Sequence, residues 1–277
     1  MHHHFTVDVE EYFNFLGFER RFPLPRWDEL ESRVEESMDR LLGLLAEHDA
    51  RGTFFTLGWI AERHPDLVRR IAAEGHEVAS HGYSHTRVVE LEPEEFRREI
   101  RVTKSTLEEL SGQAVVGFRA PHFSLLPGCE WALDLLLEEG HTYDSSLFPI
   151  RRAGYGYPDG LRDPHWLSRP AGRIAEVPPA TLRVLGRNIP AGGGAWFRVF
   201  PYELTRRALR ACERRGVAGT FYIHPWEIDP DQPLLEASAF QRWKHYSGLD
   251  RAFDRLRRLL TEFRFRPMKE TVDALPA

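Results

Sequence analysis

Apolar and polar residues follow two different periods along this chain, and segments of the two kinds alternate. Phe5, Val7 and Val9 are separated by polar residues, which is the pattern of a β-strand. Residues 29–49 instead place their apolar side chains at helical spacing, with acidic residues near the start. The same reasoning predicts strands within residues 5–13, 51–58, 76–80, 114–121, 141–146, 173–182 and 218–227, and helices within residues 29–49, 64–75, 92–112, 129–140, 201–216 and 248–263. Residues 151–170 are rich in glycine and proline and are predicted to form a loop.

Strands that alternate with helices at this spacing predict an α/β fold with a parallel sheet covered by helices. About seven such units in one domain of this size favour a barrel over an open sheet. In such barrels the chemistry takes place at the carboxyl ends of the strands. The residue types that end each predicted strand therefore indicate the chemistry of the site.

The composition changes this picture little. Apolar residues make up 42% and charged residues 29% of the chain, as in ordinary soluble proteins. The net charge of −5 gives no reason to expect nucleic acid or an anionic membrane as a partner. Cys129 and Cys212 are too few for a disulfide framework and suit a reducing compartment. We see no leader segment and no apolar run near the roughly 18 residues of a transmembrane helix, and therefore expect a cytoplasmic protein.

Polar or ionisable residues end five of the seven predicted strands. They are Asp8 and Glu10, Ser80 and His81, Arg119, Asp144, and His224. A carboxylate at the end of an apolar strand is unfavourable unless a cation or hydrogen bonds compensate it. The convergence therefore indicates an active site at this end of the barrel.

The segment SHGYSH, residues 80–85, indicates a metal site. His81 and His85 are four residues apart, so a helical turn would place both imidazoles on one face. Two histidines, one carboxylate and an open position form a recurrent hydrolytic metal site. The alternative is that both histidines are ordinary loop residues, but this alternative leaves the acids of the first strand uncompensated.

Five motifs occur in a fixed order: TVDVEEYF, SHGYSH, FRAPHFS, YDSSLFP and IHPWE. With these motifs the sequence resembles the polysaccharide deacetylases of carbohydrate esterase family four, and most of all the branch associated with exosortase and exopolysaccharide gene clusters. The resemblance runs from about Phe5 to Glu227, and the tail containing RWKHYSGLDRAFDRL is similar to a C-terminal extension of that branch. It implies a distorted (β/α) barrel of about seven parallel strands in residues 1–230, with residues 231–277 packed on it as an extension.

The resemblance also implies roles for particular residues. Asp8 matches the catalytic base, Arg119 the arginine that pairs with this base, and His224 the acid that protonates the leaving amine. Glu10, His81 and His85 match the metal ligands. Many family members place the metal-binding acid directly after the base, where this chain has Val9. Asp8 and Glu10 can still face the same site, because alternate residues of a strand share a face.

Further residues are expected around this centre. Asp144 could orient His224, as carboxylates do for catalytic imidazoles. His122 stands where the family usually has a tyrosine whose backbone N–H lines the oxyanion hole, and it could keep that role while changing substrate contacts. Phe148, Trp196 and Trp226 are candidates for stacking on sugar rings, with ordinary packing or a flexible glycine-rich connection as the alternatives.

The resemblance implies a metal-dependent hydrolase that removes N-acetyl groups from N-acetylhexosamine units of a glycan or an exopolysaccharide precursor. Two histidines and a carboxylate suit Zn²⁺ best, with Co²⁺, Ni²⁺ or Mn²⁺ as substitutes. Two alternatives stay open: a hydrolase of small cyclic amides of the allantoinase type, and a non-catalytic glycan-binding module. The presence of both a base and an acid argues against a pure binder.

Overall fold

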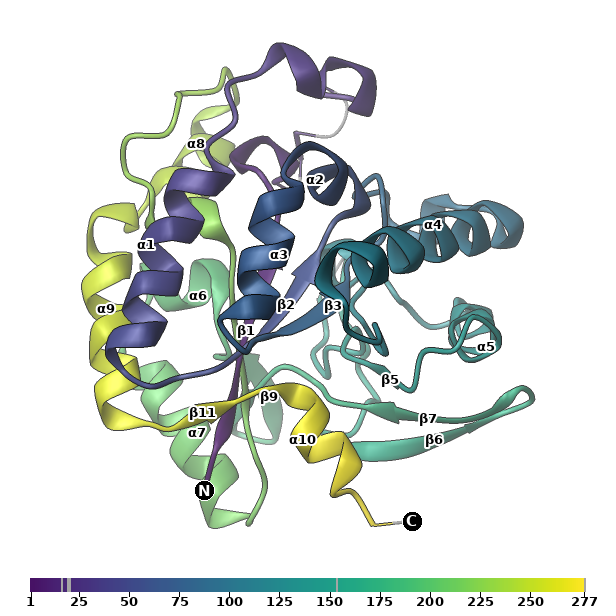
Figure 1. The fold of residues 1–277 in the computed structure, drawn as a ribbon. Helices are drawn as coiled ribbons and strands as arrows, with labels where there is room; N and C mark the ends of the chain where they lie inside the picture. The colour runs from purple at the N-terminus through teal and green to yellow at the C-terminus, as the bar shows by residue number, and fades with distance from the viewer. Residues whose placement is uncertain (16, 19–20, 153, 277) are drawn as a thin grey trace.

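One twisted sheet forms the centre of the computed structural model, which describes residues 1–15, 17–18, 21–152 and 154–276 (Figure 1). Seven neighbouring strands run parallel, in the order β10 (Thr220–Ile223), β1 (His3–Val9), β2 (Thr53–Thr56), β3 (Glu77–Ser80), β4 (Gly117–Phe118), β5 (Tyr143–Asp144) and β7 (Gly172–Glu176). β6 (His165–Arg169) adds an antiparallel edge to β7. The predicted loop and the predicted extension each include one residue, 153 and 277 respectively, outside the described part.

The barrel is closed by single bridges rather than by a full ladder. Beyond β7, Pro179 pairs with Thr220 of β10, and Gly193 pairs with Tyr222 of the same strand. Gly193 has φ +147°, and a Cβ there would lie 1.8 Å from the carbonyl oxygen of Tyr222, so only glycine permits this close approach. The structure therefore confirms a distorted barrel of about seven parallel strands.

The described part of the chain contains ten α-helices (Figure 1). They are α1 (Val34–Glu47), α2 (Gly58–Arg63), α3 (Pro65–Ala73), α4 (Pro93–Ser111), α5 (Trp131–Glu138), α6 (Gly194–Val199), α7 (Glu203–Arg214), α8 (Ala239–Tyr246), α9 (Leu249–Glu262) and α10 (Met268–Asp273). Of these helices, α6 and α8 contribute to the cavity described below. The alternation in β1 explains how the site is built. Phe5, Val7 and Val9 belong to the core shared with α1 and α9, whereas Thr6 and Asp8 lie on the other face, where Arg119 binds both.

Several short elements were not predicted. β6 lies inside the predicted loop of residues 151–170, so that part of the prediction is wrong. The sequence pattern does not reveal β6, because β6 is an edge strand without a fully buried face. The hairpin of β8 (Thr181–Val184) and β9 (Arg187–Pro190) and the short helices α2, α6, α8 and α10 were missed as well.

Residues after 231 pack on the barrel. β11 (Phe265–Arg266) pairs with β1 in parallel, and the backbone N–H of Met268 donates to Oγ1 of Thr53 at 2.8 Å. Nε2 of His4 lies 2.7 Å from Oγ1 of Thr271, so this histidine, which precedes the predicted strand, is a buried part of β1. The domain boundary at residue 230 stays a prediction. None of the helices in the described ranges is long and apolar enough to cross a membrane.

Candidate active site

Glu10, His81 and His85 meet at the carboxyl end of the barrel. One ligand atom of each lies within 4.8 Å of the others, and all three side chains are buried. Oε2 of Glu10 contacts Nε2 of His85 and lies 3.9 Å from Nε2 of His81. The segment between the histidines is not the helical turn that we predicted. Positive φ angles at Gly82 and His85 fold this loop so that both imidazoles face Glu10.

The protonation states of these side chains suit a bound cation. Nδ1 of His81 donates to the carbonyl oxygen of Arg119 at 2.8 Å, which leaves the lone pair of Nε2 directed at Glu10. Burial lowers the pKa of His81 to about 4, so this imidazole is neutral at pH 7. Burial alone would raise the pKa of Glu10, but His85, His224 and His81 hold that pKa well below its usual range. Two imidazole nitrogens and a carboxylate are a donor set that zinc accepts.

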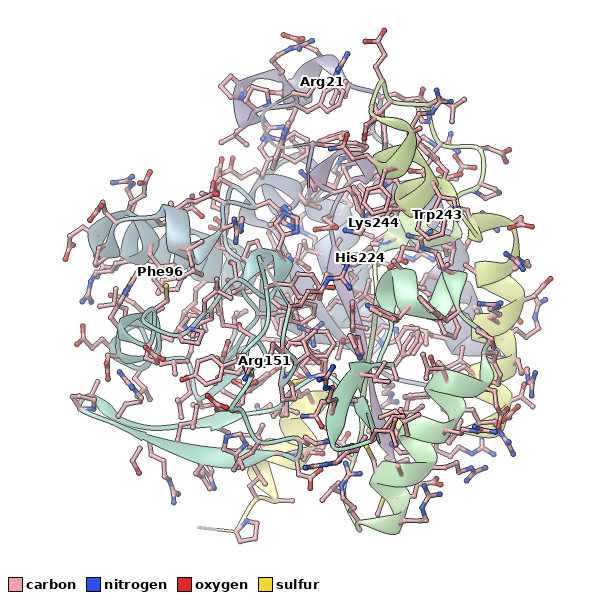
Figure 2. All side chains as sticks on the ribbon, turned by 180° about the vertical axis from the view of Figure 1, so that it is seen from behind. Arg21, Phe96, Arg151, His224, Trp243 and Lys244 are labelled. Carbon is pink, nitrogen blue, oxygen red and sulfur yellow. The ribbon has the colours of Figure 1, made fainter. Side chains whose placement is uncertain are left out.

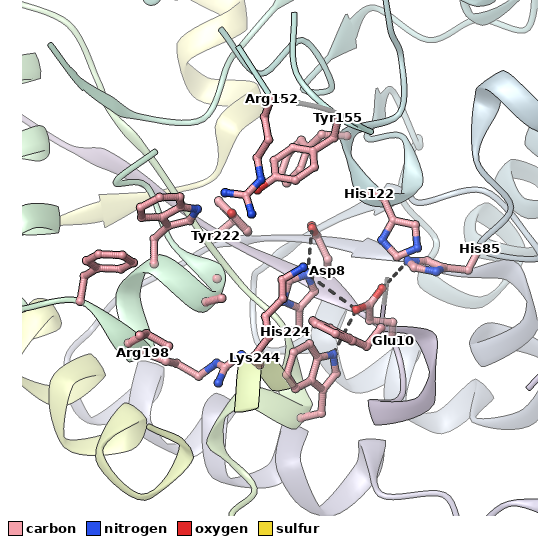
Figure 3. Close-up of a pocket in the computed structure, with 18 of the residues that line it drawn as sticks. Asp8, Glu10, His85, His122, Arg152, Tyr155, Arg198, Tyr222, His224 and Lys244 are labelled. Carbon is pink, nitrogen blue, oxygen red and sulfur yellow. Dashed lines mark hydrogen bonds and ion pairs between the residues drawn. The ribbon is translucent and has the colours of Figure 1, made fainter. Parts of the chain in front are cut away.

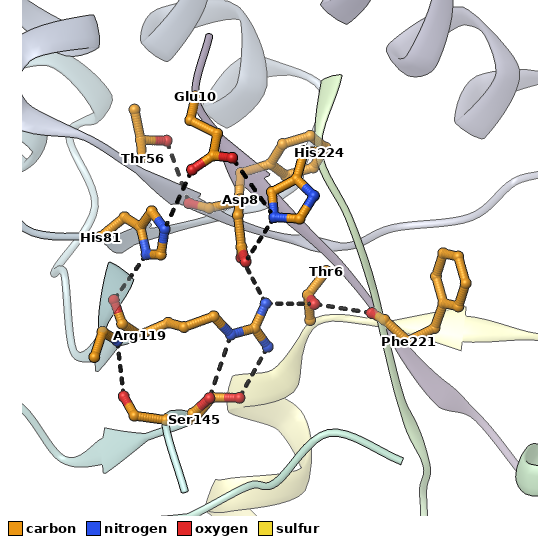
Figure 4. A network of polar contacts seen from close by, with 12 residues as sticks. Thr6, Asp8, Glu10, Thr56, His81, Arg119, Ser145, Phe221 and His224 are labelled. Atoms are coloured by element: carbon orange, nitrogen blue, oxygen red, sulfur yellow. Dashed lines mark hydrogen bonds and ion pairs between the residues drawn. The ribbon is translucent and has the colours of Figure 1, made fainter. Parts of the chain in front are cut away.

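Asp8 is held by a buried arginine (Figure 4). Nη1 of Arg119 donates to Oδ1 of Asp8 at 2.6 Å and to Oγ1 of Thr6 at 2.8 Å. The other donors of the guanidinium bind the carbonyl and the hydroxyl of Ser145, and its plane lies over Phe55. A buried charge pair is tolerated when its remaining groups are hydrogen-bonded, and this arginine meets that condition. Asp8 is therefore fixed by Oδ1, and its Oδ2 faces His224.

His224 follows β10 and faces both acids of β1. Its Nε2 lies 3.8 Å from Oδ2 of Asp8 and 3.6 Å from Oε1 of Glu10. Its Nδ1 lies 2.6 Å from Oε1 of Glu227. Burial alone would lower the pKa of His224, but Glu10, Glu227 and Asp8 raise it to about 9. The imidazole is therefore protonated at neutral pH, as a general acid requires.

Trp226 links the acid to the carboxylate of the metal cluster. Its ring is stacked on two imidazoles, 5.2 Å from His224 and 4.4 Å from His245, at interplanar angles of 16° and 22°. Its Nε1 donates to Oε1 of Glu10 at 3.0 Å. This hydrogen bond fixes the oxygen of Glu10 that does not face His85.

One open cavity of about 270 Å³ is lined by Asp8, Glu10, His81, His85, His224 and Trp226 (Figure 3). Aromatic residues make up most of its remaining wall. A cavity with one buried donor cluster, a fixed carboxylate and a protonated imidazole can bind a cation, accept a proton from water and return a proton to a leaving group.

The comparisons with known proteins agree with this chemistry. Residues 27–127 match the family model of polysaccharide deacetylases, and residues 145–273 match a domain of unknown function, DUF3473. The chain is 36% identical over 100 residues to a peptidoglycan-N-acetylglucosamine deacetylase of Bacillus cereus, an alignment that covers 36% of each protein. It is 28% identical over 196 residues to a chitooligosaccharide deacetylase of Bradyrhizobium, covering 67% of this chain and 80% of that one.

These matches show that the chain is similar to polysaccharide deacetylases over these segments. The matched segment spans only about a third of the length of the Bacillus cereus protein. Two solved structures share the fold. One, from Mycobacterium smegmatis and named as a polysaccharide deacetylase, has a TM-score of 0.66 at 23% identity and covers 98% of this chain and 89% of its own. The other, Puue allantoinase, has a TM-score of 0.63 at 18% identity, with 98% and 88% covered. The fold alone therefore does not select a substrate.

The structure brings most of the predicted polysaccharide deacetylase residues together. Asp8, Glu10, His81, His85, Arg119 and His224 form one connected cluster. Their catalytic roles stay predictions. His122 lies beside them, with its ring 4.3 Å from that of His85 and a left-handed backbone at φ 56°.

The prediction that Asp144 orients His224 is wrong. The sheet register pairs Asp144 with Phe118, and Phe118 packs outward against Phe96 of α4. Because laterally paired residues of a parallel sheet point to the same side, the carboxylate of Asp144 faces away from the barrel interior. It accepts hydrogen bonds from the backbone and hydroxyl of Ser146 instead.

One predicted sugar-stacking residue, Phe148, is also wrong, because it is fully buried against Phe123 and Tyr222, behind the cavity wall. Trp226 lines the cavity and its ring is stacked on those of His224 and His245, so its contact with a sugar stays a prediction. Trp196 does line the cavity, stacked on Phe200 at 4.6 Å, and its role stays a prediction.

Sequence reasoning missed Glu227 and Arg198. Glu227 belongs to the motif IHPWE, where a short 3₁₀ turn (Pro225–Ile228) returns it to His224. Arg198 is fully buried and pairs with Glu227. An arginine within the apolar segment AWFRVF was the available signal, because such a charge needs a buried partner.

Proposed function

We propose that this protein is a metal-dependent hydrolase that removes the N-acetyl group from an N-acetylhexosamine unit of a glycan or an exopolysaccharide precursor. One observation carries the proposal: a donor cluster, a fixed carboxylate and a protonated imidazole face the same cavity. The relatives named as peptidoglycan and chitooligosaccharide deacetylases support the choice of an acetamido group.

Glu10, His81 and His85 would hold one divalent cation, most simply Zn²⁺. When bound, the cation supplies Lewis acidity toward the acetamido carbonyl and acidity to a coordinated water. Glu10 would supply the negative charge of the site, and the neutral His81 a nitrogen donor whose orientation the carbonyl of Arg119 fixes.

Asp8 would take the proton of the attacking water on Oδ2, because Arg119 occupies Oδ1. Arg119 keeps this carboxylate ionised and oriented in its buried position. The water oxygen then joins the carbonyl carbon of the acetamido group.

His224 would protonate the nitrogen as the bond between carbon and nitrogen breaks. Its Nε2 faces Asp8 and Glu10, and Glu227 holds Nδ1. The products are acetate and a free amino sugar. In this mechanism the backbone N–H of His122, which belongs to the left-handed turn after β4, would stabilise the oxyanion.

The finer family branch is part of the same proposal. We assign the chain to the branch associated with exosortase and exopolysaccharide clusters, with residues 231–277 as its extension. The match to DUF3473 covers residues 145–273, which include strands β7 and β10 of the barrel as well as most of the proposed extension.

Acetate release tests the function. Protein loaded with zinc or cobalt would be incubated with N-acetylglucosamine oligomers, beside an Asp8→Asn variant and a control, Asp254→Asn, on the exposed face of α9. We expect release by the wild type and the control and a loss of roughly 10²–10⁴-fold in Asp8→Asn. Equal release by Asp8→Asn would overturn the assignment of the base.

A further inference from the structure

The mouth of the cavity presents large aromatic side chains to solvent. Phe200, Phe240 and Trp243 are 42%, 70% and 55% exposed, respectively. They line the same cavity as His224, together with Trp196. Figure 2 labels Trp243, Lys244 and His224 on the same side of the molecule. The rings form two stacked pairs, Trp196 on Phe200 at 4.6 Å and Phe240 on Trp243 at 6.2 Å. We call these four residues the aromatic rim. Clustered exposed aromatics of this kind mark a binding surface.

The charges around the aromatic rim are positive. Arg152 and Lys244 line the cavity, with the guanidinium of Arg152 5.6 Å from the ring of Trp196 and Nζ of Lys244 4.8 Å from the ring of Phe15. The two carboxylates among the described lining residues, Asp8 and Glu10, both belong to the catalytic centre. Arg152 makes no ion pair with a described residue, so the cavity favours an anionic group beside it.

Outside the catalytic centre the cavity wall is mainly apolar and aromatic, and the hydroxyls of Tyr155 and Tyr222 are the neutral oxygen groups of its described side chains. Among the described residues that line the cavity there is no Asn, Gln, Ser or Thr. A neutral sugar chain, or a nucleobase read by its edges, needs such donors and acceptors, because polar groups that lose water without a new partner are strongly disfavoured. An apolar wall with two cations instead fits a ligand with an apolar chain and an anionic group.

We propose that the N-acetylhexosamine is carried on a long apolar chain through a phosphate or diphosphate linkage. This inference rests on the deacetylation proposed above and names its substrate class. The acetamido group would lie at Glu10 and His224 and the phosphate or diphosphate toward Arg152 and Lys244, four residues that Figure 3 labels. The first carbons of the chain would lie on the aromatic rim. The linkage to phosphate stays intact, since water cleaves only the bond between carbonyl carbon and nitrogen.

A series of substrates tests this class. N-acetylglucosaminyl diphosphates with methyl, octyl and ten-carbon isoprenoid chains would be compared with a neutral octyl glycoside, a nucleoside diphosphate-linked N-acetylglucosamine and an N-acetylglucosamine tetramer. Each buried methylene contributes roughly a fourfold gain. We expect kcat/KM to rise at least tenfold from the methyl to the ten-carbon compound. We also expect the octyl diphosphate to exceed the neutral octyl glycoside.

Two double variants test which residues produce these ratios of kcat/KM. A double substitution, Phe240→Ala with Trp243→Ala, should bring the ratio between the ten-carbon and methyl compounds below about three. Arg152→Gln with Lys244→Gln should remove the preference for the diphosphate over the neutral glycoside. The control Leu185→Ala, at a 98% exposed position between β8 and β9, should leave both ratios unchanged.

Binding of the same compounds to the Asp8→Asn protein distinguishes failure of the proposed deacetylation from failure of the proposed substrate class. Chain-dependent binding without acetate release by the wild type keeps the ligand class and overturns the deacetylation. Acetate release without chain or phosphate dependence, or a preference for the tetramer or the nucleotide sugar, overturns the ligand class alone. Neither binding nor release overturns both.

Discussion

Nδ1 of His224 and Oε1 of Glu227 lie 2.6 Å apart, and the second oxygen of this carboxylate is bound by Arg198. Arg198 also donates to the backbone carbonyls of Lys244, His245 and Ser247. The orientation of the proposed acid therefore depends on a segment that follows the barrel, at the end of α8. Since Glu227 also raises the pKa of His224, it supplies both position and charge.

Replacing this carboxylate tests both effects. Glu227→Gln keeps an acceptor for Nδ1 but removes the negative charge, so the pKa of His224 should fall. The high-pH limb of kcat, where the acid loses its proton, should then move to lower pH, with kcat reduced roughly 10- to 100-fold at neutral pH. A pH–rate profile measures this, with Glu270→Gln on α10 as the control. An unshifted limb would contradict the role of Glu227.

Asp8 at the end of β1 and Glu10 directly after this strand are predicted to have different roles. Glu10 contacts the imidazoles, whereas Asp8 pairs with Arg119. Glu10→Gln should reduce bound metal well below one equivalent, because the site loses its negative charge. Asp8→Asn should keep one equivalent and lose turnover. Metal content by mass spectrometry after dialysis distinguishes them, and loss of metal from both variants would show that Asp8 is itself a ligand.

The sequence predicted the parts of the fold that depend on repeated patterns. Phe5, Val7 and Val9 alternate because β1 packs against helices on one face and lines the barrel on the other. The carboxyl ends of β1, β3, β4 and β10 could be identified in the same way, and they supply the cluster. The edge strand β6 could not, since one row of half-exposed residues resembles a loop.

The orienting carboxylate was misassigned for a reason of geometry. Asp144 and His224 both end strands, but the face to which a strand-end residue points depends on its register with the neighbours. Asp144 shares its row with the outward-facing Phe118, while Ser145 faces inward to Arg119. The register between strands that are distant in the sequence cannot be predicted from the local pattern of residues. The 3₁₀ turn that returns Glu227 to His224 depends in the same way on surrounding contacts.

Trp226 is predicted to support the metal cluster. Trp226→Phe keeps an aromatic ring beside His224 and His245 but removes the hydrogen bond from Nε1 to Glu10. Partners of this kind usually contribute 10- to 100-fold in metal affinity. We expect the dissociation constant for zinc, measured by competition with a chelator, to rise by about that factor. The matched control Trp166→Phe loses a hydrogen bond to the carbonyl of Pro276 at 2.8 Å and should not change metal affinity. Equal affinities for all three proteins would contradict a supporting role.

His141 should make the fold sensitive to acid. It is 1% exposed, its ring lies edge-on to Phe118, and neither ring nitrogen has a hydrogen-bond partner among the described residues. Burial lowers its pKa to about 4, against an ordinary value near 6.5. Between these values the unfolded chain binds a proton that the folded chain does not, so stability falls as the pH falls, by about 1.4 kcal/mol per pH unit.

The variant His141→Phe removes this contribution and keeps a ring of similar size. From pH 6.5 down to about pH 4, the wild type should lose stability relative to the variant, with a difference of about 2 kcal/mol at pH 5. Urea unfolding at a series of pH values measures the difference, and the other buried histidines cancel because both proteins contain them. The control is His2→Phe, at an exposed position, and the difference in stability between this variant and the wild type should not change with pH. A difference between His141→Phe and wild type that stays constant with pH would show that His141 is protonated equally in the folded and unfolded states.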